Sequence, residues 1–198
     1  SAWRGVRALP NNACYTCMFV LCSYRVNDGA AITQFEITTA IALKLFAEHP
    51  ADVLLLEVGL GGRLDATNVI EKPIASVITP ISMDHESFLG DELSGIAYEK
   101  AGILKSGVPS VIARQSQEAM SVIAEVAGRI GAPMRILGQD FDAFQEQGRM
   151  IYQTENRVID LPMPNLVGQH QIGNAAMAIA TLETAGLMPS AAALEHGL

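Results

Sequence analysis

The sequence has few basic residues and few cysteines, and each shortage excludes a class of protein. Its 198 residues contain 13 Lys and Arg against 21 Asp and Glu, which gives a formal net charge of -8. Proteins that bind nucleic acid phosphates need clustered Lys and Arg, so no nucleic acid partner is expected. The three cysteines, Cys14, Cys17 and Cys22, form neither a disulfide framework nor a zinc-site pattern. A reduced, cytoplasmic protein is therefore expected.

The sequence also lacks a long apolar segment of the membrane-spanning kind. The apolar stretch from Ala13 to Cys22 is too short to cross a bilayer, although the preceding Arg4 and Arg7 give it a faint likeness to a signal peptide. No membrane partner is expected. The Cys14-x-x-Cys17 pair is either a redox pair or incidental, and no strand-to-helix pattern around it favours a redox role.

With 49% hydrophobic residues, the chain can bury a substantial core. Thr33 and Glu36 form a capping box that predicts a largely buried helix running to about His49. Further helices are predicted from Asp91 to about Leu104, from Ser116 to Ile130 and from His170 to Ala185. Continuous apolar runs predict buried strands at residues 52–58, 74–79, 109–113 and 134–137. Two short segments, 150–153 and 158–161, are predicted to form antiparallel strands.

This alternation predicts an α/β fold with a mostly parallel sheet flanked by helices and a small antiparallel excursion, incomplete at both ends. Residues 1–29 show poor periodicity and are treated as an atypical segment. Residues 30–187 are expected to form one domain, and residues 188–198 the start of a linker to an absent C-terminal domain.

Three polar residues interrupt the apolar pattern where an α/β sheet places its site. Glu57 ends the first predicted strand, His85 follows the second, and Lys100 lies on the next helix. Ligands of open α/β sheets bind at the carboxyl ends of the strands, which predicts Glu57 and His85 on one rim. A carboxylate and an imidazole there can hold a divalent metal. The alternative is a helix-capping glutamate and a solvated loop histidine.

A glycine-rich segment, residues 59–68, follows the first predicted strand. Its glycines allow the backbone to approach a ligand closely, and Arg63 or Asp65 is suited to position a charged substrate. The glycine spacing does not match the dinucleotide fingerprint, which disfavours a Rossmann oxidoreductase. A generic glycine-rich turn is the alternative.

Five blocks, in this order, resemble the signature blocks of the dihydrofolate synthase/folylpolyglutamate synthase family, relatives of the Mur ligases. The blocks are residues 57–68, 78–85, 89–91, 96–103 and 168–176, and the resemblance extends over residues 31 to about 187. It implies a central ligase domain that uses ATP and Mg²⁺ to activate a carboxylate as an acyl phosphate, which an amine then attacks. The implied substrates are dihydropteroate or folate, glutamate and ATP.

The resemblance also implies roles for individual residues. Glu57, His85 and Lys100 match magnesium ligands expected to converge on one site, with Lys100 carbamylated and, like His85, catalytic. Asn174 matches a position that contacts the nucleotide base. The positions near the pterin pocket are Thr33, Phe35, Asp65 and Ala66.

Three of these assignments have simpler alternatives. Lys100 alone would indicate a surface lysine in a salt bridge one helical turn away. Asn174 near a helix N-terminus is also suited to satisfy backbone groups. Phe35 is equally suited to a hydrophobic core.

The sequence departs from the family in one motif. None of its four lysines, Lys44, Lys72, Lys100 and Lys105, follows a glycine, so the family's phosphate-binding Gly-Lys loop is missing from these residues. We therefore expect impaired activity for this chain alone. A complete member is expected to be monomeric, and a fragment with open sheet edges is expected to self-associate. The alternatives are a noncatalytic remnant that binds folate or a partner, and another Mur-type amino acid ligase.

Overall fold

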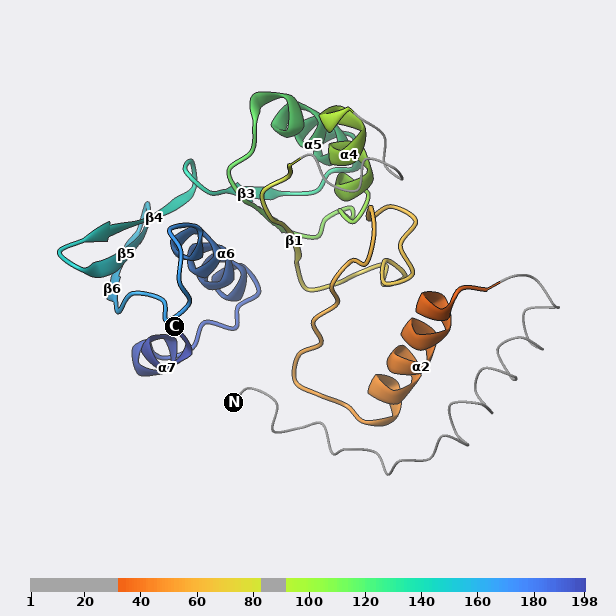
Figure 1. Ribbon diagram of the computed structural model, residues 1–198, viewed down its shortest axis with the longest axis horizontal. Helices are drawn as coiled ribbons and strands as arrows, with labels where there is room; N and C mark the ends of the chain where they lie inside the picture. The colour runs from red at the N-terminus through yellow and green to blue at the C-terminus, as the bar shows by residue number, and fades with distance from the viewer. Residues whose placement is uncertain (1–31, 83–91) are drawn as a thin grey trace. The chain divides into compact units, whose positions relative to one another are not determined.

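The computed structural model describes residues 32–82 and 92–198, which belong to two compact units (Figure 1). The first unit extends to Gly59 and includes Asp65–Val69. The second contains Leu60–Leu64 and Ile70–Leu198. His85 and Asp91, which the sequence analysis named, lie outside the described residues.

Helix α2 (Gln34–Glu48) belongs to the first unit and begins with the predicted capping box. The Glu36 N–H donates to the Thr33 hydroxyl at 3.2 Å, and the Thr33 N–H donates to the Glu36 carboxylate at 2.7 Å. The hydrogen bonds from Thr33 lower the pKa of Glu36. The expectation that α2 is largely buried was wrong, because Ile37 is its only buried residue in the structure described. Its apolar residues find no sheet to cover them among the described residues of this unit.

The predicted strand at residues 52–58 was also wrong, because the structure forms no strand there. Four consecutive apolar side chains, Val53–Leu56, are exposed, and Leu55 is exposed to 89%. A strand needs a hydrogen-bonded neighbour, and none of the described strands pairs with this run. An apolar run shows that a segment tends to be buried, but its pairing depends on residues elsewhere in the chain.

The second unit contains the predicted parallel sheet. Strands β1 (Ser76–Ile78), β2 (Ser110–Ile112) and β3 (Met134–Ile136) pair in the order β1-β2-β3. In their register, Val77 lies beside Val111, which lies beside Arg135. These strands confirm three of the four predicted parallel strands, each shorter than the apolar run that predicted it.

Helices cover both faces of this sheet, as predicted. Helices α4 (Leu93–Ala101) and α5 (Gln117–Ile130) share one buried cluster with Ile78 and Ile112. Helix α6 (His170–Thr184) shares the other cluster with Val111. Successive residues of a strand point to opposite faces, so the neighbours Val111 and Ile112 belong to different buried clusters. Helices α4 and α5 lie together on one side of the parallel sheet in Figure 1. Helix α4 ends three residues before the predicted Leu104.

An antiparallel sheet of three strands follows: β4 (Phe141–Glu146), β5 (Arg149–Thr154) and β6 (Arg157–Leu161). It confirms the predicted excursion and adds β4, which the sequence analysis missed. Gln147 and Gly148 connect β4 to β5 with φ of 48° and 78°, the positive pair that a tight hairpin turn needs. Helix α7 (Ala191–Gly197), also not predicted, buries Leu194 in the cluster that contains α6.

Glu183 near the end of α6 links that helix to the two sheets. It accepts hydrogen bonds from the buried Tyr152 hydroxyl and from the Arg135 guanidinium, both at 3.0 Å. Burial, together with the Glu183 charge, raises the pKa of Tyr152.

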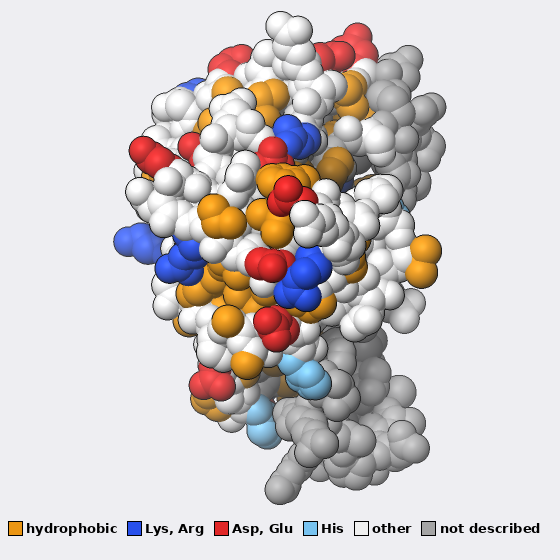
Figure 2. All heavy atoms as spheres, turned by 90° about the vertical axis from the view of Figure 1, so that its left-hand side faces the viewer, with side chains coloured by type: hydrophobic (Ala, Val, Ile, Leu, Met, Phe, Trp, Pro, Cys, Tyr) orange, Lys and Arg blue, Asp and Glu red, His pale blue; other side chains and the backbone are white. Residues whose placement is uncertain are grey.

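On the face shown in Figure 2, acidic and basic side chains lie next to each other. Within the described residues, no helix combines the length and apolar character needed to cross a membrane.

We predict that Ile112→Ala lowers the free energy of unfolding by about 2 to 5 kcal/mol, because it leaves a cavity between β2 and the α4–α5 layer. Urea unfolding followed by circular dichroism measures the change. Val158→Ala is the matched control, because Val158 is 69% exposed in β6 and its truncation should cost less than about 0.5 kcal/mol. Equal losses in the two variants would contradict the assignment of Ile112 to the core.

Candidate functional site

Lys100 lies half-buried in the last turn of α4, with the Leu60–Leu64 part of the glycine-rich segment packed beside it. A Cβ added to Gly62 would lie 2.6 Å from the Glu99 carbonyl oxygen and 3.1 Å from the Lys100 Cα. Gly62 also has a φ of +156°, a backbone conformation that residues with a side chain rarely adopt. Glycine is therefore required here by a close backbone approach to the lysine-bearing turn.

Arg63 joins the same turn through its backbone and its side chain. The Arg63 N–H donates to the Glu99 carbonyl oxygen at 2.8 Å. Its Nε and Nη2 both donate to Glu99 Oε1, at 3.0 and 2.9 Å. The guanidinium carbon also lies 5.8 Å from the centre of the Tyr98 ring, within cation–π range. The hydrogen bond and charge of Glu99 raise the pKa of Arg63.

The structure argues against a salt bridge as the role of Lys100. The positions three and four residues away on its helix and just beyond are Ile96, Ala97, Ile103 and Leu104, all apolar. Among the described residues no acidic side chain forms an ion pair with Lys100. A half-buried amine without an acidic partner is better suited to chemistry at its nitrogen than a paired ammonium.

Asp65 organises the glycine-rich segment within the first unit. Its Oδ2 accepts from the Gly59 N–H at 3.1 Å, and its Oδ1 accepts from the N–H and hydroxyl of Thr67 at 2.9 and 2.6 Å. The carboxylate thus folds the segment back on itself as a side-chain turn. This structural work was missed in the sequence analysis, which treated Asp65 only as a substrate-binding residue.

Phe35 lies over Gly59 in the same unit. A Cβ on Gly59 would come within 2.5 Å of the Phe35 ring, so the ring packs directly on the glycine backbone. Phe35 is still 45% exposed, which excludes the alternative that it is simply a core residue. Since Gly59 also donates to Asp65, the structure brings two of the four predicted pterin-pocket residues to one place. Thr33 caps the same helix two residues before Phe35, and Ala66 follows Asp65.

The predicted convergence of the metal ligands remains a prediction. Glu57 is exposed in the first unit, Lys100 belongs to the second, and His85 lies outside the described residues. No group of three potential ligands among His, Cys, Asp and Glu occurs in residues 32–82 and 92–198. Because residues 52–58 are not a strand, the strand-rim argument for Glu57 fails. Its proposed role rests on the family resemblance alone.

Gln115, in the connection between β2 and α5, and Glu118, in the first turn of α5, bind the two chain segments that flank residues 83–91. The Gln115 amide donates to the Thr79 carbonyl and accepts from the Ile81 N–H, each at 2.9 Å. Glu118 accepts from the Ser94 N–H at 3.1 Å, in the first turn of α4. The sequence analysis missed both residues, because their partners are more than 20 positions away and leave no local signal.

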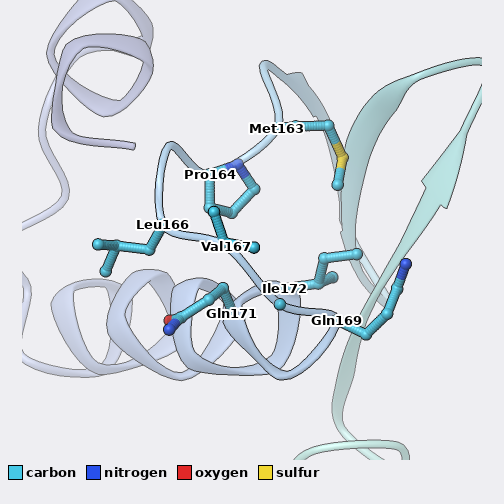
Figure 3. Close-up of a pocket in the computed structure, with 8 residues that line it drawn as sticks. Met163, Pro164, Leu166, Val167, Gln169, Gln171 and Ile172 are labelled. Carbon is cyan, nitrogen blue, oxygen red and sulfur yellow. The ribbon is translucent and has the colours of Figure 1, made fainter.

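Asn174 lies in the second turn of α6, and its neighbour Gln171 lines a hollow of about 340 Å³. Its Nδ2 donates to Gln171 Oε1 at 3.0 Å, and Gln171 in turn lies 3.0 Å from His170 Nε2. Gln171 lines the hollow together with apolar residues, and Figure 3 shows Pro164, Val167 and Ile172 gathered above the first turn of the helix. The site offers exposed amide groups next to apolar surface.

Comparisons with known proteins show which family the chain resembles. The family model of the Mur ligase middle domain matches residues 7–182. The dihydrofolate synthase/folylpolyglutamate synthase of Bacillus subtilis is 42% identical over 157 residues, which are 76% of this chain and 36% of that protein.

Solved structures give the same picture. Escherichia coli FolC in complex with ADP matches with a TM-score of 0.82 and 35% identity, over 96% of this chain and 44% of that one. A complex of FPGS with AMPPCP and folate matches with a TM-score of 0.80 and 30% identity, over 93% of this chain and 48% of that one. The chain therefore spans just under half of these solved chains, and about a third of the curated relative.

We predict that Asp65→Ala accelerates amide hydrogen exchange at Gly59 and Thr67 by about tenfold or more, because both N–H groups lose a charged acceptor. Exchange followed by NMR measures this effect residue by residue. Glu71→Ala removes a nearby exposed carboxylate and is the matched control, expected to leave both rates unchanged. Unchanged exchange in Asp65→Ala would show that the segment is ordered by other contacts.

Proposed function

Because the chain belongs to the Mur ligase middle-domain family, we propose that it is the central part of an ATP-dependent ligase that joins glutamate to dihydropteroate or folate. The observation that carries the proposal is the environment of Lys100. This half-buried lysine lacks an acidic partner among the described residues and lies against a glycine-rich segment that a side chain would disrupt. A relative that is 42% identical over 157 residues is a dihydrofolate synthase/folylpolyglutamate synthase, which supports the proposal.

Lys100 is proposed to act as a carbamate. Its neutral amine attacks the carbon of CO2, an N–C bond forms, and one proton leaves the nitrogen to solvent. The product is an anionic oxygen ligand where an ammonium would repel a cation. No acidic side chain in the described structure forms an ion pair with Lys100.

The folate or dihydropteroate ring is proposed to bind at Phe35 and Asp65. Phe35 offers an exposed aromatic face that is supported from behind by Gly59, and stacking on such a face suits a flat heterocycle. Two further residues are proposed to contact the substrate. Thr33 lies two residues before Phe35 in the sequence, and Ala66 directly follows Asp65. A FPGS structure that contains folate supports this choice of ligand.

The nucleotide base is proposed to bind near Asn174. The amides of Asn174 and Gln171 supply donors and acceptors, and the hollow that Gln171 lines with apolar residues supplies a surface for the base. Relatives solved with ADP and AMPPCP support a nucleotide ligand.

The proposed reaction has two steps. A carboxylate oxygen of the pterin substrate attacks the γ-phosphorus of ATP, the bond to ADP breaks, and an acyl phosphate forms. The amino nitrogen of glutamate then attacks the acyl carbon, phosphate leaves with the bonding electrons, and the nitrogen loses its proton. The residues of this chain are proposed to serve the reaction by holding the pterin and the base in place.

Magnesium fits the donor set proposed for it. Glu57, His85 and carbamylated Lys100 would offer carboxylate, imidazole and carbamate groups, which suit a hard divalent cation or its bound waters. When bound, magnesium neutralises part of the charge of two anionic reactants that must approach each other.

We propose the cytoplasm as the location and a monomer as the complete enzyme.

A second candidate function is folate binding without turnover. The Phe35–Gly59–Asp65 arrangement favours it, because this part of the site needs no metal. The two functions differ at Lys100, which a noncatalytic binder has no need to carbamylate.

We predict that ¹³C-bicarbonate gives a carbamate resonance that disappears in Lys100→Arg. The arginine keeps the positive charge but does not form a carbamate at neutral pH. Lys105→Arg is the matched control, since Lys105 follows the same helix and lies outside the signature blocks, and it should keep the resonance. A resonance of equal intensity in Lys100→Arg would contradict the assignment.

We predict that Phe35→Ala weakens folate binding by about fivefold or more, because base-on-aromatic stacking contributes on the order of 1 to 3 kcal/mol. Titration calorimetry of this chain with folate measures the dissociation constant. Phe46→Ala is the matched control, because Phe46 lies on the same helix and is exposed to a similar degree, 41% against 45%. Equal weakening by both substitutions would place the ligand elsewhere.

A further inference from the structure

The ion pair of Arg63 and Glu99 joins the glycine-rich segment to the last turn of α4, which carries Lys100. No local sequence pattern predicts this pair. The two residues are 36 positions apart, and their side chains are 44% and 24% exposed. An isolated pair with that exposure contributes little to stability. Its position directly before Lys100 therefore calls for an explanation other than stability.

Backbone contacts fix the pair in place. The Glu99 carbonyl oxygen accepts from the Arg63 N–H at 2.8 Å and also from the Gly102 N–H at 3.2 Å. A Cβ on Gly102 would lie 2.6 Å from the Arg63 Cα, so the arginine backbone fills the space that a side chain would take. Arg63 thus caps the C-terminal end of α4, where a positive charge is favourable.

The same contacts restrict Lys100. Its Cα faces Gly62, and its carbonyl oxygen accepts from the Ile103 N–H at 3.3 Å as the helix ends. The last turn of a helix frays readily unless side chains hold it. Two hydrogen bonds from one guanidinium to Glu99, with Tyr98 beneath, limit that fraying one residue before the lysine.

We propose that Arg63 is a positioning residue for Lys100: through its ion pair with Glu99 it holds the last turn of α4 against Gly62, so that the Lys100 nitrogen is presented for carbamylation. This inference rests on the proposed function of Lys100. Carbamylation is reversible, so a lysine held in place forms the adduct at a lower entropic cost than one on a fraying turn. Residues that orient a ligating group typically change ligand occupancy by about 10 to 100-fold when they are removed.

The test is a titration of this chain with ¹³C-bicarbonate, with the Lys100 carbamate resonance as the readout. Arg63→Gln and Glu99→Gln should each raise the bicarbonate concentration for half occupancy by about tenfold. The double variant should be no worse than either single one, because both remove one interaction. Arg63→Lys keeps the positive charge but cannot donate two hydrogen bonds from one planar group. Its bicarbonate concentration for half occupancy should lie between those of the wild type and Arg63→Gln.

Arg149→Gln is the matched control. It breaks an exposed ion pair, Arg149 Nε to Asp160 Oδ1 at 2.6 Å, between strands β5 and β6. It should leave carbamate occupancy unchanged, and its urea midpoint should shift as much as those of Arg63→Gln and Glu99→Gln. Equal midpoints with unequal occupancies separate positioning from a general loss of stability.

Two outcomes would overturn the proposal, and they are distinguishable. A wild-type resonance that persists unchanged in Arg63→Gln and Glu99→Gln rejects the positioning role and leaves the function of Lys100 intact. The absence of any Lys100-dependent resonance in the wild type rejects both the positioning role and the carbamate on which the proposed function depends.

Discussion

The close approach of the Gly62 backbone to the last turn of α4 is the constraint on which the candidate site depends. It requires a residue without a side chain at 62, and it lets the Arg63 N–H reach the Glu99 carbonyl oxygen. The Arg63–Glu99 pair then follows from the position of the backbone. This loop contact fixes the position of the end of the helix and therefore the position of the Lys100 backbone. The glycine-rich segment acts here as a packing element of the second unit.

The layers of the second unit provide the rigid base for this contact. Strand β2 divides its side chains between two buried clusters, with Val111 toward α6 and Ile112 toward α4 and α5. Ile96, Ala97 and Ala101 hold helix α4 in this packing, and the Arg63–Glu99 pair adds a polar contact at its end. Gln115 and Glu118 extend from the same region to the segments that flank residues 83–91. Rigid elements and short polar ties together position the proposed chemistry.

The sequence predicted the elements whose signal is local and missed those that depend on distant partners. The capping box at Thr33 and the helical period of α5 were both recognised from nearby residues. Residues 52–58 have the composition of a buried strand, but pairing requires a neighbour that composition does not reveal. At the site, the family resemblance indicated roles for Lys100 and Asn174. The Arg63–Glu99 ion pair and the hydrogen bonds by which Asp65 orders its own segment are visible only in the three-dimensional structure.

The most direct test of the central claim is phosphate release from ATP by a chimera. In it, residues 32–187 replace the corresponding segment of the Bacillus subtilis relative, which is 42% identical. We predict release that depends on glutamate together with dihydropteroate or folate, and a loss of about a hundredfold or more in Lys100→Arg. A folded chimera that is equally active with Lys100→Arg would contradict the account, because the lysine would then have no part in the chemistry.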